Sequence, residues 1–212
     1  MKKMKKIILI ITALIFTLNI NAQLDRSVMP TGGPSPKIKL DKPKEFKLKN
    51  GIKVLVVENH KLPRVNYSLR FDRKPIVVGE KAGVISLLGS MLGNGTTSIS
   101  KDEFNEEVDF LGASVNVGFG SGFAFTLTKN NERVLDLFSD AVINPLLTEE
   151  EFEKEKEKLI EGLKSQKKDI DAISGRVGDA LSYGKSHAYG EFITEQTINN
   201  ISFQDVLDLS LI

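Results

Sequence analysis

Hydrophobic and polar residues alternate along two stretches of the chain, which is the pattern of half-buried strands. The first stretch contains Asn50-Gly51, a dipeptide typical of tight hairpins, and the strand after it is the more apolar of the two. In the second stretch, Gly118, Gly120 and Gly122 permit a sharp reversal between two strands. The pattern therefore predicts strands over residues 46–48, 52–57, 65–71, 115–119 and 123–127.

Apolar residues spaced three and four positions apart predict helices around these strands. One helix is expected over residues 84–92, ending at Gly93. Side chains typical of helix starts precede three more, in the pairs Ser100 and Glu103, Thr148 and Glu151, and Ser202 and Asp205. Another helix is expected over residues 134–142, before Pro145, and the tail after residue 168 is expected to alternate short helices with Gly-rich turns. This order predicts an α+β fold in which helices pack on one face of an antiparallel sheet.

The N-terminus has the features of a secretion signal. Four lysines among the first six residues precede an apolar run of 14 residues, Ile7 to Ile20, and Ala22 supplies a small residue before the expected cut. The run is shorter than the roughly 20 residues that a membrane-spanning helix needs. We therefore expect an exported protein with a signal peptide over residues 1–22, an extended Pro-rich and Gly-rich lead-in over 23–43, and one domain over 44–212. An uncleaved membrane anchor is the alternative.

Composition narrows the chemistry further. The 212 residues carry a formal charge of +1, which falls to −3 when the four lysines of the signal are removed, so charge gives no argument for nucleic-acid binding. The chain has no Cys, which excludes disulfides, thiol catalysis and Cys-ligated zinc. With only His60 and His187, it cannot build a site from several imidazoles.

Six segments in order resemble the pitrilysin/insulinase family of zinc metallopeptidases. They are F-K-L-K-N-G-I-K-V-L-V-V-E-N at 46–59, A-G-V-I-S-L-L-G-S-M-L-G-N-G-T-T at 82–97, D-F-L-G-A-S-V at 109–115, F-E-K-E-K-E-K-L-I-E-G-L at 152–163, H-A-Y-G at 187–190 and I-S-F-Q-D-V at 201–206. The resemblance extends from the first of these segments to the last and so spans essentially the whole chain after the lead-in. The resemblance implies the family's fold.

The chain departs from this family at the metal site. The resemblance implies an H-x-x-E-H motif on the first helix, in which two His bind zinc and the Glu activates water. Anchored on Gly95-Thr96, the two His positions fall on Ser86 and Ser90 and the Glu position on Gly89, while the third ligand position falls on Gly162. Ser is a poor zinc ligand and Gly offers no side chain, so we expect no zinc, no cofactor and no catalysis by this chain alone.

Two interpretations remain open for the small residues on the first helix, Ser86, Gly89, Ser90 and Gly93. They form either a packing or partner surface, or a stripe that fits a tight spot against the chain's own sheet. The two histidines are interpreted as exposed or loop-fixing residues rather than as ligands or bases.

Two other motifs are interpreted as structural features. G-F-G-S-G at 118–122 lies between strands rather than before a helix, so it is interpreted as a hairpin tip and not a phosphate loop. The Glu and Lys run from 149 to 168 is interpreted as a solvated helix face. In the resembling family this sheet lines a chamber where extended peptides add as an edge strand, so a peptide contact is implied for Val115, Asn116, Val117, Gly118 and Phe119.

The resemblance also implies partners. Family subunits usually hold two such domains, and a zinc-bearing subunit often works with one that lacks zinc. We expect an exported protein of a periplasmic or extracellular compartment, in a Gram-negative envelope, that completes a peptidase chamber with an active pitrilysin-like subunit and is truncated before a second domain. Zinc is expected only in that partner.

A stand-alone peptide-binding or scaffold module is the main alternative function, and an enzyme with an unrecognised site is a third possibility. Neither nucleic acid nor stable membrane insertion after signal cleavage is expected.

Overall fold

A computed structural model describes residues 32–35 and 42–211 of the chain. The predicted signal peptide over residues 1–22 and most of the predicted lead-in lie outside the described residues. The chain divides into two compact units at the boundary between Glu58 and Asn59. The single domain predicted over residues 44–212 stays a prediction.

In the first unit, two short strands form an antiparallel hairpin. Strand β1 (Lys44–Lys47) pairs with β2 (Lys53–Val56), with Phe46 opposite Val54. The Gly51 N–H donates to the Leu48 carbonyl at 2.9 Å, the Leu48 N–H donates to the Ile52 carbonyl at 2.8 Å, and Gly51 has a φ of 95°. The predicted hairpin is confirmed, but its turn has three residues, with Gly in the left-handed position that such a loop requires.

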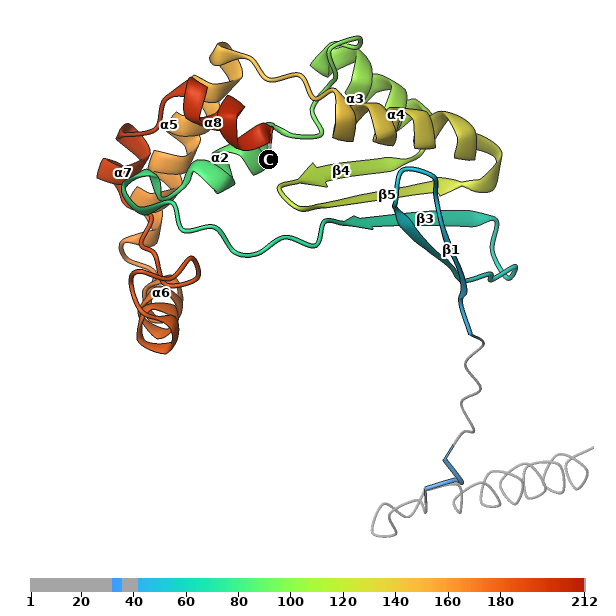
Figure 1. Cartoon of the computed structure of the whole chain (residues 1–212), viewed down its shortest axis with the longest axis horizontal. Helices are drawn as coiled ribbons and strands as arrows, with labels where there is room; N and C mark the ends of the chain where they lie inside the picture. Colours follow the sequence, from blue (N-terminus) through green and yellow to red (C-terminus); the bar gives the residue numbers. More distant parts are fainter. Residues whose placement is uncertain (1–31, 36–41, 212) are drawn as a thin grey trace, which may run out of the picture. The chain divides into compact units, whose positions relative to one another are not determined.

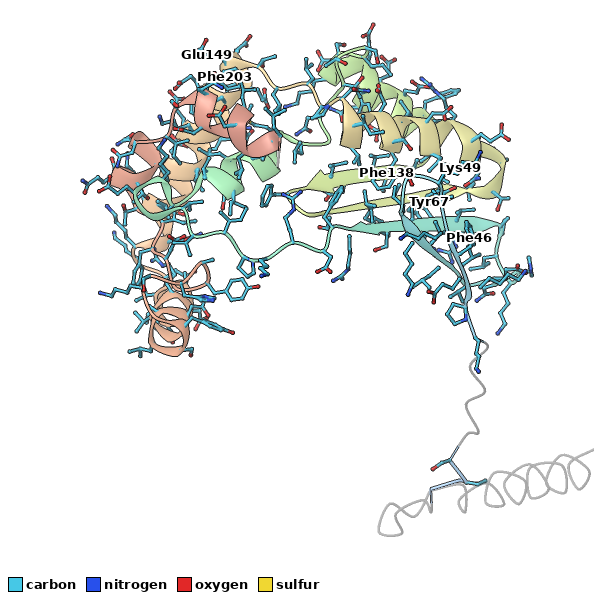
Figure 2. The ribbon with its side chains drawn as sticks, viewed as in Figure 1. Phe46, Lys49, Tyr67, Phe138, Glu149 and Phe203 are labelled. Carbon is cyan, nitrogen blue, oxygen red and sulfur yellow. The ribbon has the colours of Figure 1, made fainter. Side chains whose placement is uncertain are left out.

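The second unit contains a three-stranded antiparallel sheet in the order β3-β5-β4. Its strands are β3 (Arg64–Arg70), β4 (Ser114–Gly118) and β5 (Ser121–Leu127). Helices α3 (Lys101–Phe110) and α4 (Asn131–Ile143) cover one face (Figure 1), where Phe104, Val108, Leu137 and Phe138 pack on the sheet. Figure 2 labels Tyr67 of β3 and Phe138 of α4, whose rings stack with centroids 6.5 Å apart. The predicted antiparallel sheet with helices on one face is confirmed.

A second cluster of buried residues joins three helices. Helix α2 (Val84–Met91) packs against α5 (Glu149–Gln166) and α8 (Phe203–Ser210). Phe152 of α5 lies 5.8 Å from Phe203 of α8, measured between ring centroids. Leu92, directly after α2, packs against both this cluster and the sheet cluster. The inward side of α2 therefore packs in the helical cluster, and Leu92 links that cluster to the sheet.

The predicted helix starts are confirmed in detail. Ser100 and Ser202 each accept a hydrogen bond from the backbone N–H three residues on, and the side chain at that position accepts one in return. Thr148 accepts from the Glu151 N–H at 3.3 Å. These side chains satisfy N–H groups that a helix start leaves unpaired, which is why the sequence signal is reliable here.

One prediction for the tail is wrong. Residues expected to form short helices and Gly-rich turns include α6 (Ile170–Tyr183), a helix of 14 residues that contains Gly175 and Gly178. Asp169 caps it by accepting hydrogen bonds from the Asp171 and Ala172 N–H groups. Gly lowers helix propensity without ending a helix, and the Asp169 cap was the stronger signal. The short helix α7 (Glu195–Asn199) follows, and η1 (Gly79–Lys81) and η2 (Thr128–Asn130) are single 3-10 turns.

Candidate functional site

Helix α2 presents its small residues away from the protein core. Its apolar stripe is buried at Val84, Leu87, Leu88 and Met91. Residues four positions apart lie on the same side of a helix, so this burial turns Ser86 and Ser90 together towards solvent. Both serines are exposed and Gly89 is half-buried. The structure thus places the three degenerate positions of the motif on one side of α2.

The small residues of this stripe differ in how tightly they pack. A Cβ atom at Gly89 would meet no atom within 4 Å beyond its own helix backbone, and the same holds for Gly162 on α5. At Gly93, in contrast, a Cβ atom would lie 3.0 Å from the backbone nitrogen of Val117, and φ is 75°. The interpretation of a tight spot against the sheet therefore holds for Gly93 and is wrong for Gly89.

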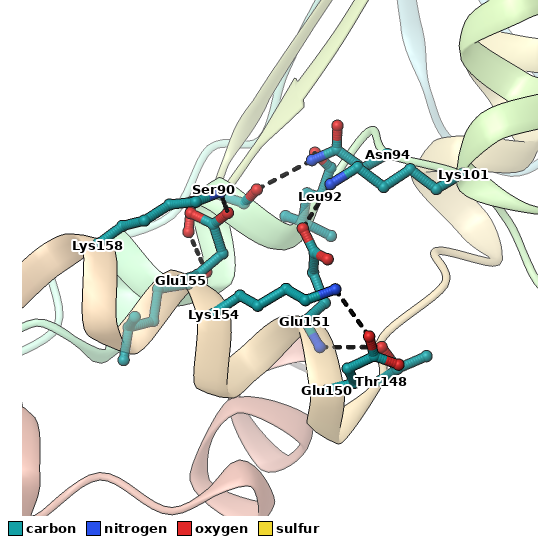
Figure 3. A network of polar contacts seen from close by, with 11 residues as sticks. Ser90, Leu92, Asn94, Lys101, Thr148, Glu150, Glu151, Lys154, Glu155 and Lys158 are labelled. Carbon is teal, nitrogen blue, oxygen red and sulfur yellow. Dashed lines mark hydrogen bonds and ion pairs between the residues drawn. The ribbon is translucent and has the colours of Figure 1, made fainter.

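Polar contacts surround the C-terminal end of α2 (Figure 3). The Ser90 hydroxyl donates to the Leu87 carbonyl at 2.9 Å, and the Asn94 amide donates to the Ser90 carbonyl at 3.0 Å. On the neighbouring helix α5, the Lys158 ammonium pairs with the Glu155 carboxylate at 2.6 Å. The hydroxyl that occupies a His position of the motif therefore bonds within its own helix.

Other acidic groups of α5 also have cationic partners. Glu151 pairs with Lys101, the first residue of α3, at 2.5 Å. Lys154 pairs with Glu150 at 2.7 Å, and its hydrogen bond lowers the pKa of the Glu150 carboxyl. Most residues of the run from 149 to 168 are exposed, in agreement with the predicted solvated face.

The side chains at the expected metal positions do not fit zinc. Ser86 and Ser90 offer neutral hydroxyls, and Gly89 and Gly162 offer no side-chain donor. Zinc sites use imidazole, thiolate or carboxylate ligands. Within residues 32–35 and 42–211, no three His, Cys, Asp or Glu side chains are grouped so that they hold a metal ion.

Strand β4, for which a peptide contact is implied, lies at an edge of the sheet. It pairs with β5 on one side, with Asn116 opposite Phe123 and Val117 opposite Gly122. Asn116 is exposed, Val117 is buried, and Val115, Gly118 and Phe119 are half-buried. Because an edge strand keeps a row of backbone N–H and C=O groups unpaired by its own sheet, β4 has the backbone geometry that an added strand requires. The close approach of Gly93 to Val117 brings this edge next to α2.

His187 stabilises the loop of the H-A-Y-G motif. Its ring stacks on Tyr183 with centroids 5.4 Å apart, and its Nδ1 accepts a hydrogen bond from the Tyr189 N–H at 3.2 Å. A Cβ atom at Gly190 would lie 2.1 Å from the Gly184 carbonyl oxygen, so only Gly fits there. The contacts of His187 and the close packing of Gly190 thus give the H-A-Y-G motif a structural role. His60 is exposed in the segment that follows β2.

One cavity was not predicted from the sequence. A hollow of about 280 Å³ lies between α5, α6 and the segment after Gly190, and its lining includes Gly162 and Arg176. The sequence marks Gly162 only as a degenerate ligand position and gives no signal for Arg176. The Asp169 cap was the signal for the helix that carries Arg176.

Comparisons with known proteins agree with this fold. Residues 79–181 match the model of the insulinase family, peptidase family M16. The fold is similar to the crystal structure of a peptidase M16 inactive domain from Pseudomonas fluorescens, with 20% identity and a TM-score of 0.66 over 80% of this chain. It is also similar to the crystal structure of a protease from Helicobacter pylori, with 21% identity and a TM-score of 0.69 over 81% of this chain. No curated protein sequence matches the chain significantly.

The chain corresponds to part of these solved structures. It covers 43% of the length of the Pseudomonas fluorescens chain and 43% of the length of the Helicobacter pylori chain.

Proposed function

We propose that this chain, whose residues 79–181 belong to the insulinase family of peptidases, family M16, is a non-catalytic member that completes a peptidase chamber with an active partner subunit. Ser86, Gly89 and Ser90 on α2 carry the proposal, because they replace both imidazoles and the general base that a zinc peptidase needs. The helix that bears them is packed against α5 and α8 through its buried side. A chain that keeps the scaffold and lacks the chemistry is suited to a structural or substrate-binding role.

Strand β4 supplies the substrate-facing part of the proposal. Extended peptides bind to exposed sheet edges through main-chain hydrogen bonds, which depend little on sequence. The edge position of β4 and the exposure of Asn116 support a peptide contact over residues 115–119. In this role the chain contributes binding surface, and the partner contributes zinc and the general base.

Export is the third part of the proposal. The basic start and the apolar run before Ala22 support secretion into the periplasm or the extracellular space. In the part of the chain that the structure describes, no helix combines the length and the apolar character needed to cross a bilayer. The partner is accordingly expected in the same exported compartment.

Co-purification of the tagged full chain from the native envelope tests this function. The expected result is a second subunit with an intact H-x-x-E-H motif, and peptide cleavage by the pair that exceeds cleavage by the partner alone. Recovery of this chain without such a subunit, from cells that express one, would favour the stand-alone peptide-binding module.

A matched pair of variants separates the peptide contact from subunit assembly. Asn116→Lys changes an exposed side chain on the β4 edge, and Asn66→Lys makes the same change on β3, the opposite edge of the sheet. We expect Asn116→Lys to raise the KM of the assembled pair for peptide, and Asn66→Lys to leave this KM unchanged. Both variants should still co-purify with the partner. Equal KM values for both variants would contradict a role for β4.

A further inference from the structure

The hollow between α5 and α6 has an apolar wall. Its volume is about 280 Å³, and Leu159, Leu163 and Ile193 line it. Gly162 also lines it, and no atom lies within 4 Å of the place where a Cβ atom of this residue would be. A side chain at position 162 would therefore occupy space that is open here. The cavity depends on the glycine of this chain.

Three charged residues also line the hollow, and two of them already have partners. The Glu191 carboxylate accepts hydrogen bonds from the Val78 N–H at 3.1 Å and the Gly79 N–H at 2.6 Å. Lys158 pairs with Glu155 at 2.6 Å. The Glu191 carboxylate is therefore hydrogen-bonded to the backbone before α2, and the Lys158 ammonium has an anionic partner.

Arg176 is different. Its Nε donates to the Ala172 carbonyl of its own helix at 3.3 Å, and it forms no ion pair with any described residue. The side chain is half-buried. A guanidinium group has five N–H donors in a planar fork that matches a carboxylate. Its two terminal nitrogens thus remain available beside an apolar wall.

We infer that this hollow binds a carboxylate that carries a small apolar group. The Arg176 fork binds the carboxylate, Leu159, Leu163 and Ile193 contact the apolar group, and the absent side chain of Gly162 provides the space. The volume suits a ligand about the size of one amino-acid residue. Two sources share this chemistry, namely the C-terminal residue of a peptide and a free small carboxylic acid. The inference does not depend on a peptidase partner.

Calorimetry on the full chain with paired probes tests the inference. The probes are 4-methylpentanoate, acetyl-Ala-Ala-Leu with a free carboxylate, and the amide of each, which keeps the apolar group and loses the charge. We expect each amide to bind about tenfold more weakly than its acid, or weaker still, because a hydrogen-bonded charge is lost. Tighter binding of the tripeptide acid identifies a peptide C-terminus as the ligand, and tighter binding of 4-methylpentanoate identifies a free acid. Equal binding of acid and amide, or binding of neither acid, overturns the inference.

Variants locate the site. Arg176→Gln should weaken binding of the acids about tenfold or more. Arg176→Lys keeps the charge without the planar fork, so its affinity for the acids should lie between those of Arg176→Gln and the wild type. Arg70→Gln on β3 is the matched control and should bind the acids as the wild type does.

Gly162→Leu should abolish binding by filling the hollow, whereas Gly178→Leu, at an open helical glycine on α6, should not. Unchanged binding by Arg176→Gln and Gly162→Leu overturns the assignment. If Arg176→Gln does not fold, the comparison of acid with amide on the wild type still decides.

Discussion

Two glycines of this chain occupy opposite kinds of environment. At Gly122 on β5, a Cβ atom would lie 2.8 Å from Cε2 and 2.9 Å from Cζ of Phe138. At Gly89 on α2 it would meet nothing within 4 Å. The sequence suggested a turn role for Gly122, but the reversal takes place at Phe119 and Gly120, and Gly120 has a φ of 93°. Gly122 is instead required because α4 packs directly against β5.

This contrast predicts opposite effects for the same substitution. Gly122→Ala should lower the free energy of unfolding by about 1–3 kcal/mol, because the ring of Phe138 must move within a packed core. Gly89→Ala should raise it by about 0.5–1 kcal/mol through helix propensity alone. Urea unfolding of both variants measures the difference. A destabilised Gly89→Ala variant would show that the exposed side of α2 is closed by other parts of the protein.

At the scale of secondary-structure elements, α8 is held at its start by one carboxylate. Asp205 accepts hydrogen bonds from the Ser202 N–H at 2.9 Å and from the Ser202 hydroxyl at 2.8 Å, and it pairs with Lys81 of η1. The hydrogen bond from Lys81, followed by the one from the Ser202 N–H, lowers the pKa of Asp205 to about 2. The I-S-F-Q-D-V motif thus joins α8 to the segment that precedes α2.

The lowered pKa predicts a pH-dependent stability. A carboxyl group with a folded-state pKa below its unfolded value stabilises the protein above about pH 4, and this stabilisation is lost as the pH falls towards 2. Asp205→Asn should therefore lower the free energy of unfolding by about 1 kcal/mol at pH 7, and the difference from the wild type should shrink by pH 3. Unfolding by urea at both pH values is the measurement. Glu153→Gln, at an exposed acid on α5, is the control, and a pH-independent effect of Asp205→Asn would contradict this account.

The secondary-structure elements differ in how well the sequence alone predicts them. Local signals were sufficient for α3, α5 and α8, because Ser100, Thr148 and Ser202 hydrogen-bond to residues three positions away. The buried stripe of α2 also followed from spacing, and with it the exposed side that carries Ser86 and Ser90. The order β3-β5-β4 and the hollow beside Arg176 depend on contacts between residues distant in sequence, which no local pattern encodes.

On the scale of the whole molecule, α6 exposes an apolar stripe. Ile170 and Leu181 are 81% and 82% exposed, and Ile173 and Val177 are exposed on the same side. The residues of α6 that are half-buried are Ala172, Arg176 and Ala180. The helix therefore turns two alanines and Arg176 inward and its large apolar side chains to solvent. Contiguous apolar surface of this kind is usual at protein interaction sites.

This surface predicts self-association of the isolated chain. Light scattering at rising concentration should show species larger than a monomer, and Leu181→Lys should reduce them. Ser182→Lys, which adds the same charge beside the stripe without removing an apolar side chain, should not. A monodisperse monomer at high concentration, with no binding of a dye specific for apolar surface, would count against both the self-association and the need for a partner.

We propose that this chain has no metal chemistry of its own, and its zinc content tests this proposal most directly. The purified chain, equilibrated with zinc and dialysed, should hold far less than one zinc per chain, should leave unfolded peptides uncut, and should unfold at the same temperature with and without a chelator. The variant that combines Ser86→His, Gly89→Glu, Ser90→His and Gly162→Glu is the matched comparison, and it should gain zinc if the open side of α2 still faces α5. One tightly bound zinc per wild-type chain, together with peptide cleavage that a chelator abolishes, would contradict the account.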